Sequence, residues 1–221
     1  MIITCWSPKS GSGTSVVAAA LAGSAAQAGR RTLLVDLGGD SAAILGLSTP
    51  VLGIGDVVEG DGAQSLLDVA VKVSGNFDLV SPGLRPLPEL HVSRWARIES
   101  QLVEISQLGT LVVIDTGVET YPDWVKRISD RIHLVIRPCY LALRRAVEHH
   151  RSADLGDGII VVTERDRALT ARDVTLVLNR PIIAEVPVHP DIARRVDAGL
   201  FNSHIPERLA HALTGVVRDA L

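Results

Sequence analysis

Hydrophobic positions along the chain fall into short continuous runs, separated by stretches in which apolar residues recur with helical spacing. Leu111-Val112-Val113-Ile114 and Ile159-Ile160-Val161-Val162 are two of the runs, and their β-branched content is typical of strands. Because the runs are apolar throughout rather than alternating, they predict a parallel sheet that is buried on both faces.

This pattern predicts strands with helices between them. The strands are expected at 2–6, 31–37, 77–81, 110–115, 131–137, 158–163 and 182–186. The helices are expected at 14–28, 64–72, 91–107, 122–128, 140–150, 170–178, 190–198 and 206–220. The Gly- and Asp-rich stretch 50–63 is expected to be a loop or a short-helix connection. No linker or repeat interrupts the alternation, so we predict a single α/β domain over 1–221, a doubly wound, mostly parallel sheet of about seven strands.

A glycine loop follows the first expected strand. Residues 8–15 read Pro8-Lys9-Ser10-Gly11-Ser12-Gly13-Thr14-Ser15, and an Ala-rich helical stretch comes next. This context is typical of a phosphate-binding loop, because backbone N–H groups of the loop and of the helix N-terminus point at one anion. Gly11 and Gly13 let the backbone approach a phosphate closely and adopt positive φ. In the standard motif a lysine follows the last glycine, and Thr14 occupies that place here.

Composition and charge narrow the class of protein. The chain has 221 residues, of which 47% are hydrophobic, enough to bury a sheet on both faces. Its net charge of −3 argues against a protein whose main role is to coat nucleic acid. The only cysteines, Cys5 and Cys139, lack the spacing of a zinc site or a disulfide framework. No apolar run reaches the length of a membrane span and no leader-like stretch precedes the first strand, so we expect a cytoplasmic protein.

Four parts of the sequence together resemble the ParA/MinD family. With Lys9 at its second position, the loop resembles the family's deviant Walker A motif, Lys-Gly-Gly-x-Gly-Lys-Thr. Residues 31–36 resemble the second strand of the family and its acidic end, and residues 111–117 resemble its Walker B and switch II segments. Val186-Pro187-Val188-His189-Pro190 with Asp197-Ala198-Gly199 resembles the C-terminal strand and proline turn. Within the family, residues 137–145 and the weakened loop look most like the TadZ/CpaE branch, whose members help to localise pilus machinery.

The resemblance implies a P-loop NTPase fold with ATP or ADP and Mg²⁺ as cofactors. The residues that would bind the nucleotide are Lys9, Gly11, Ser12, Gly13, Thr14 and Ser15. Ser15 would ligate Mg²⁺ and Asp115 would hold it through a water molecule. If the site is active, Lys9, Asp36 and Asp115 would be its catalytic residues, with Lys9 reaching the nucleotide of a second subunit in a homodimer. Two plainer interpretations stay open: a solvated loop lysine for Lys9, and a strand-end cap for Asp115.

Several positions depart from the family pattern, and each departure weakens phosphate binding, water activation or base recognition. They are Pro8 and Ser10 for loop glycines, Thr14 for the Walker lysine, Gly38 for the second Asp after strand two, and Thr163-Glu164 for the adenine-reading Asn. Because phosphoryl transfer depends on positioning and charge, their combined loss predicts very slow hydrolysis.

Three functions are compatible with this sequence. The first is a ParA/MinD-like positioning or scaffold protein with weak or no ATP hydrolysis, which localises a pilus, a septum or another assembly. The second is a slow but active ParA-type ATPase in DNA or cargo partition. The third is a biosynthetic enzyme on the same fold, similar to dethiobiotin synthetase. We disfavour the third because Thr14 and Gly117-Val118-Glu119 supply neither the Walker lysine nor the substrate lysine that it needs.

An aromatic pair and two basic pairs are candidate partner surfaces. Tyr121 and Trp124 follow the switch II segment and are either anchors for a partner subunit or part of the core. Arg144/Arg145 and Arg194/Arg195 are short basic pairs of the kind that contacts DNA in ParA-like proteins. A solvated helix face is the favoured interpretation of both pairs, so nonspecific DNA binding is open but disfavoured.

The C-terminal stretch 206–213 is amphipathic. It lacks the Lys/Arg-rich face that a MinD-type membrane anchor needs, so we expect it to pack on the domain. Recruitment to a pole, a septum or a membrane-associated assembly would then depend on partner proteins.

Overall fold

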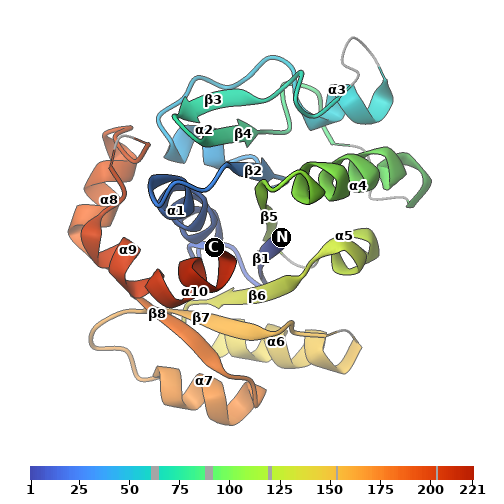
Figure 1. Ribbon diagram of the computed structural model, residues 1–221. Coiled ribbons are helices and arrows are strands. Elements are labelled where there is room, and N and C mark those ends of the chain that lie inside the picture. Colours follow the sequence, from blue (N-terminus) through green and yellow to red (C-terminus); the bar gives the residue numbers. More distant parts are fainter. Residues whose placement is uncertain (61–64, 88–91, 119–120, 153, 203) are drawn as a thin grey trace.

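Eight strands lie side by side in one sheet, which runs through the middle of the molecule between two layers of helices (Figure 1). Their spatial order is β3-β4-β2-β5-β1-β6-β7-β8, and all neighbours are parallel except β3 and β4. The strands are β1 (Ile2–Ser7), β2 (Thr32–Asp36), β3 (Val71–Ser74), β4 (Phe77–Val80), β5 (Leu111–Val118), β6 (Arg131–Ile136), β7 (Gly158–Thr163) and β8 (Ile182–Pro187). The computed structural model describes residues 1–60, 65–87, 92–118, 121–152, 154–202 and 204–221.

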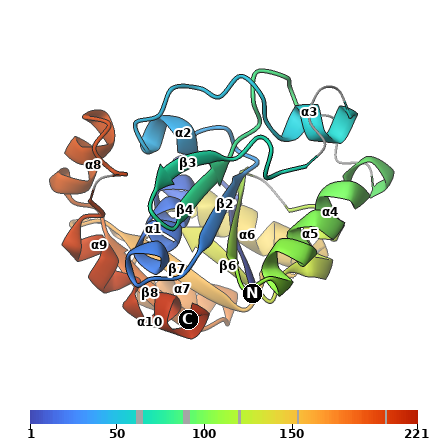
Figure 2. The same ribbon diagram turned by 45° about the horizontal axis from the view of Figure 1, so that its top comes forward.

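Helices cover both faces of the sheet (Figures 1 and 2). Those of one layer are α1 (Thr14–Gln27), α2 (Ser41–Ile44), α8 (Pro190–Asp197), α9 (Glu207–Ala212) and α10 (Thr214–Ala220). Those of the other are α3 (Ile54–Glu59), α4 (Val92–Gln107), α5 (Asp123–Ile128), α6 (Tyr140–Ser152) and α7 (Ala171–Leu178). Within β1, Ile3 and Cys5 face the first layer and Ile2 and Trp6 the second, which explains why the strand is apolar at successive positions.

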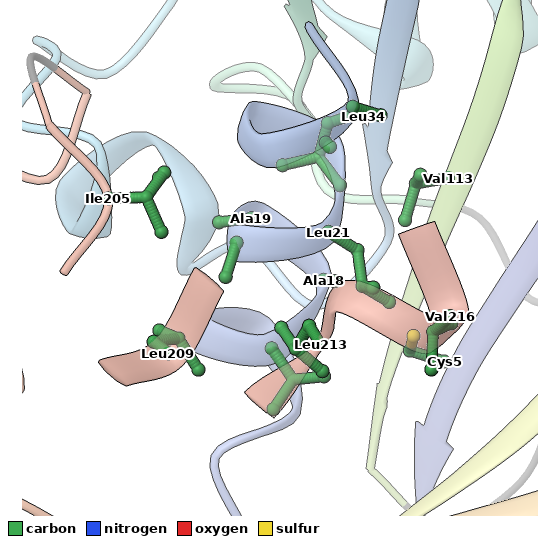
Figure 3. Close-up of a cluster of buried hydrophobic side chains, with 14 of the residues drawn as sticks. Cys5, Ala18, Ala19, Leu21, Leu34, Val113, Ile205, Leu209, Leu213 and Val216 are labelled. Carbon is green, nitrogen blue, oxygen red and sulfur yellow. The ribbon is translucent and has the colours of Figure 1, made fainter. Parts of the chain in front are cut away.

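α1 is buried between the sheet and the C-terminal helices. Its alanines Ala18, Ala19, Ala20, Ala22 and Ala25 have no exposed surface, and a Cβ added at Gly23 would come 2.9 Å from the side chain of Ile205. Figure 3 shows Leu209 and Leu213 packed against it from the side opposite the strands. The expected packing of the C-terminal stretch on the domain is therefore confirmed. None of the helices in the described residues is long and apolar enough to cross a membrane.

The prediction of a helix at 64–72 is wrong, and the predicted strand count was one too low. Residues 65–70 form turns, and β3 follows as an edge strand that pairs antiparallel with β4. Leu66 and Val69 are buried three residues apart, which gives the segment its helix-like spacing. Gly75-Asn76 between two short apolar runs was the hairpin signal that identifies β3.

Three smaller corrections concern helices and aromatic residues. α2 was not predicted, and the expected helix over 206–220 is divided at Leu213 into α9 and α10. Tyr121 and Trp124 are core residues, with 7% and 1% of their surface exposed, so they are not surface anchors for a partner subunit. Trp124 stacks on Trp95 of α4 with ring centroids 5.2 Å apart.

The topology brings the ends of three central strands to one edge of the sheet. From β1 the chain crosses through α1 to β2, two places away on one side, while β6 lies directly on the other side. Ligands of doubly wound sheets bind at such a change of direction, outside the carboxyl ends of the strands. The glycine loop follows β1 at this point.

Candidate functional site

The loop between β1 and α1 has the backbone shape of an anion-binding loop. Gly11 and Gly13 both adopt left-handed conformations, with φ of 74° and 88°. The carbonyl oxygen of Lys9 accepts hydrogen bonds from the hydroxyls of Ser7 and Ser12, at 3.0 and 2.8 Å, which fixes the curve of the loop. Gly13 is the N-cap of α1 and supplies no side-chain cap, so the N–H groups of the first helical turn remain available to an anion.

A cavity of about 470 Å³ opens above this loop. Its lining comes from four segments: the loop and start of α1, the turn after β2, α2, and the end of β5. The predicted nucleotide residues Lys9, Gly11, Ser12, Gly13, Thr14 and Ser15 all line it. The structure therefore places the six residues of the predicted binding loop around one space.

Lys9 carries the one positive charge among the residues that line this cavity in the described part of the chain. Its ammonium group donates to the carbonyl oxygen of Ser10, 2.9 Å away, in its own loop. Thr14, at the position of the missing lysine, is nearly buried at the start of α1. An anion here would thus be held by backbone N–H groups and hydroxyls, with little fixed charge.

Two acidic residues near the ends of adjacent strands share one local structure. Asp36 and Asp115 are neighbours in the β2–β5 register, and each begins an Asp-x-Gly sequence. The N–H of Gly38 donates to Asp36 at 2.9 Å, and the N–H of Gly117 donates to Asp115 at 2.9 Å. The turn after β2 and the irregular last part of β5, where the pairing with β1 shifts register, are therefore each fixed by the carboxylate that precedes them.

Beyond this shared bond the two carboxylates differ. Asp36 also accepts from the N–H groups of Gly39 and Ser41, at 2.7 and 2.8 Å, so both of its oxygens hold the turn into α2. Burial nevertheless keeps the pKa of Asp36 above its ordinary value, against the effect of these bonds. Neither Asp36 nor Asp115 is among the described residues that line the cavity. The three hydrogen bonds of Asp36 show that its carboxylate holds the turn in place.

One carboxylate oxygen of Asp115 is available to a ligand. Its Oδ2 is buried and has no hydrogen-bond partner in the described residues. Burial raises the pKa of Asp115 to about 6, helped by the charge of Asp36, while the nearby hydroxyl of Ser15 and the N–H of Gly117 act in the opposite direction. An unpaired buried carboxylate oxygen beside a hydroxyl is a donor set that suits Mg²⁺ with bound water.

Metal binding here would be shared with a ligand. No group of three or more His, Cys, Asp or Glu side chains is arranged to hold a metal ion within the described part of the chain. Mg²⁺ commonly takes one or two protein ligands and completes its shell with water and phosphate oxygens. Ser15 and Asp115 fit that pattern, and they are the pair that the sequence predicted.

The turn after β2 and the irregular last part of β5 touch directly through two glycines. A Cβ added at Gly38 would lie 3.1 Å from Cα of Gly117, and one added at Gly117 would lie 3.0 Å from Cα of Gly38. Gly117 also has a φ of 71°, which favours glycine. This contact closes one side of the cavity, so a side chain at position 38 requires the turn after β2 or the last part of β5 to move. Sequence reasoning missed it, although the repeated Asp-x-Gly pattern was its signal.

Glu164, which stands with Thr163 where the family reads adenine, is held by two arginines. Its Oε2 lies 2.6 Å from a terminal guanidinium nitrogen of Arg137 and also accepts from Arg167. The two arginines lower the pKa of Glu164 below its ordinary value. The carboxylate is thus engaged within the protein, and it does not line the cavity above the glycine loop.

Asp115 and His133 give opposite pH dependences of stability. Burial lowers the pKa of His133 from 6.5 to about 4, so its folded state resists protonation and the free energy of unfolding falls as pH drops from 6.5 to 4. The pKa of Asp115 rises from 3.8 to about 6, so the free energy of unfolding falls as pH increases from 4 to 6. Each effect amounts to about 3 kcal/mol, and the two oppose each other.

Single substitutions should separate these effects in Mg²⁺-free denaturant titrations between pH 4 and 7. For Asp115→Asn we expect the free energy of unfolding to increase with pH by about 3 kcal/mol, because the opposing effect of Asp115 is removed and the effect of His133 remains. For His133→Leu we expect it to decrease with pH by a similar amount. Parallel pH profiles for the two variants would contradict the assignment.

A family model described as the CobQ/CobB/MinD/ParA nucleotide binding domain matches residues 3–200. No curated protein sequence matches the chain.

Solved structures with the same fold cover nearly the whole chain. A ParA family ATPase from Chlorobium tepidum superposes with a TM-score of 0.75 at 20% identity, covering 98% of each chain. MinD from Pyrococcus horikoshii, complexed with Mg-ADP, gives a TM-score of 0.77 at 20% identity and covers 99% of this chain and 94% of its own. The MinC:MinD cell division complex of Aquifex aeolicus gives a TM-score of 0.75 at 21% identity, and the match covers 99% of this chain and 94% of that one. At these identities the likeness establishes the fold.

Proposed function

The chain belongs to the CobQ/CobB/MinD/ParA nucleotide-binding family, and from this premise we propose that it is a ParA/MinD-like positioning or scaffold protein. In this proposal the protein binds ATP or ADP with Mg²⁺ and hydrolyses ATP very slowly or not at all. Nucleotide would act as a ligand that organises the surface for partners of a pilus, a septum or a similar assembly. The features shared with the TadZ/CpaE branch favour a pilus.

One observation carries this proposal: the glycine loop has the backbone shape of a phosphate site, while Lys9 is the one cation among the described residues that line its cavity. The left-handed glycines and the uncapped start of α1 support binding. Thr14 supplies no cation, and the ammonium of Lys9 is turned onto its own loop. Charge stabilisation usually contributes the largest part of phosphoryl-transfer catalysis, so binding and turnover separate here.

In this proposal the residues of the chain have separate roles in binding the phosphates and Mg²⁺. Backbone N–H groups from Gly11 to Ser15 bind phosphate oxygens. The hydroxyl of Ser15 and, through water, the carboxylate of Asp115 hold Mg²⁺, which when bound neutralises phosphate charge. Asp36 holds the turn after β2 through hydrogen bonds from three backbone N–H groups, and we assign it no contact with the ligand. No side chain at position 38 is available to orient a water molecule.

A slow but active partition ATPase is the alternative. It would need Lys9 to leave Ser10 and reach a phosphate, in its own subunit or in a second one. The loop fits such a movement, since Lys9 is held there by a single side-chain hydrogen bond. Measured turnover decides between the two functions. A biosynthetic role remains disfavoured because Thr14 offers no lysine at the phosphates.

Titration with labelled ATP and ADP, with and without Mg²⁺, tests the proposal. We expect both nucleotides to bind, and removal of Mg²⁺ to weaken binding by about tenfold, as expected for the loss of a charge-assisted contact. Asp115→Asn should abolish this Mg²⁺ dependence, whereas Asp40→Asn, which removes the one carboxylate among the described residues that line the cavity, should retain it. Absence of binding under all conditions would refute the proposal.

We further propose a homodimer with the loop face at the two-fold axis. Lys9 motivates it, because an ammonium at this early position can reach the phosphates of an opposite subunit. With Tyr121 and Trp124 in the core, nucleotide must supply the contact. We therefore expect light scattering to show a dimer with Mg-ATP and a monomer for Lys9→Ala, while Lys72→Ala, an exposed lysine of β3, should still dimerise. A wild-type monomer at saturating Mg-ATP would exclude this dimer.

A further inference from the structure

A second hollow lies at the edge of the molecule beside α8. It measures about 700 Å³ and lies between α8 and residues 204–208, which lead into α9. Figure 1 shows these elements at the left of the view, outside the layer formed by α1. Its volume falls in the range of small-molecule sites, and none of the residues that line it belongs to the cavity above the glycine loop.

Basic side chains outnumber acidic ones in this hollow. Its charged or titratable lining consists of His189, Arg194, Arg195, His204 and Arg208, with Asp191 and Glu207. Arg194 pairs with Asp191. Arg195 is half-buried and Arg208 is exposed, and neither guanidinium makes an ion pair or a hydrogen bond within the described residues. A bound anion would therefore give both guanidinium groups the charged partner that the described residues do not supply.

The floor of the hollow is apolar. Ile192 and Pro206 are buried there, and Leu200, 51% exposed, stands at its margin. A surface that binds duplex DNA needs cations spaced along the phosphate backbone, and an apolar floor adds nothing to such binding. Guanidinium groups around a concave apolar surface suit a compact ligand that has a phosphate at one end and a ring at the other.

We propose that this hollow binds a small organic phosphate of nucleotide size. Arg195 and Arg208 hold the phosphate, and the ring of the ligand lies over Ile192 and Pro206. The site is distinct from the glycine loop. It does not depend on the function proposed for that loop, and its test separates the two.

The experiment first blocks the glycine loop. Gly11→Asp is suited to this, because no atom lies within 4 Å of a Cβ at Gly11 and aspartate tolerates its φ of 74°. The new carboxylate repels phosphate from the loop. Calorimetric titration of this variant with ADP and with inorganic pyrophosphate then reports on the hollow alone. We expect ADP to bind at least about threefold more tightly than pyrophosphate, because only ADP has a ring that can lie on the apolar floor.

Charge removal then locates the bound phosphate. In the Gly11→Asp background, Arg195→Gln with Arg208→Gln should weaken ADP binding by about tenfold or more. Arg218→Gln, an exposed arginine of α10 outside the hollow, should change it by less than about twofold. Unchanged thermal melting of each variant shows that folding is intact.

Three results would overturn this site. They are an absence of ADP binding by Gly11→Asp protein up to about 1 mM, equal effects of the Arg195/Arg208 and Arg218 substitutions, and retention of duplex DNA that ADP does not displace. The last result would assign the arginines to a polynucleotide. If the function proposed for the loop fails instead, Gly11→Asp leaves ADP affinity at the wild-type level while the arginine substitutions still lower it.

Discussion

Thr14→Lys should tighten nucleotide binding by about 10- to 100-fold without producing a fast ATPase. Thr14 lies at the start of α1 and lines the cavity above the glycine loop, so a lysine there places an ammonium beside the phosphates. A charge-assisted hydrogen bond contributes about 1.5–3 kcal/mol, which sets the expected gain. Turnover should stay well below about 1 per second, because Gly38 provides no group to position water.

Thr14→Gln is the matched control for this change. Glutamine lengthens the side chain without adding charge, so we expect less than about a threefold gain in affinity. Equilibrium binding of labelled ATP, together with phosphate release, measures both quantities for the two variants. Fast turnover by Thr14→Lys would mean that the missing lysine alone prevents hydrolysis and that Gly38 is not a barrier.

Gly46→Ala should lower the free energy of unfolding by about 3 kcal/mol, a fall in Tm of roughly 6–12 °C. A Cβ at Gly46 would lie 2.1 Å from the carbonyl oxygen of Gly199, a backbone atom that side-chain rotation cannot move. Its φ of 68° adds strain for any residue with a side chain. The contact joins the end of α2, which supplies Ile44 to the cavity, to the end of α8.

Substitutions at two other glycines separate the steric clash from the backbone strain. Gly29→Ala has no atom within 4 Å of its Cβ but a φ of 93°, so it should show the strain alone, about 1 kcal/mol. Gly75→Ala has open space and no left-handed backbone, so it should change stability by less than about 0.5 kcal/mol. Differential scanning calorimetry on the three variants measures the series, and equal melting of Gly46→Ala and Gly75→Ala would show that α2 and α8 are not in firm contact.

The alternation of strands and helices along the chain and the place of the loop were predictable because both follow from local patterns. Apolar runs without alternation indicated a sheet covered on both faces, and a strand, a glycine loop and an Ala-rich helix identified the anion-binding turn. β3 was missed because burial of Leu66 and Val69 imitates helical spacing over a turn. Gly75-Asn76 carried the competing information, which the helix prediction overrode.

The roles of individual side chains were less predictable, since they depend on contacts between distant segments. The family resemblance gave Asp36 a catalytic role if the site is active, and it carried no sign that three backbone N–H groups occupy the oxygens of this carboxylate. Tyr121 was open to two interpretations. Its burial is settled by packing on Trp6 and by the bond from its hydroxyl to the carbonyl oxygen of Asp154, 2.7 Å away. No spacing in the sequence encodes either contact.

A single-turnover assay tests most directly whether binding and hydrolysis are separated in this protein. Purified protein in excess is mixed with γ-labelled ATP and Mg²⁺, and bound and hydrolysed nucleotide are measured from the same samples over time. The account predicts that most of the label is bound within the first sample and remains ATP for many minutes, far from a turnover of about 1 per second. Conversion of the bound ATP to ADP within seconds would contradict it.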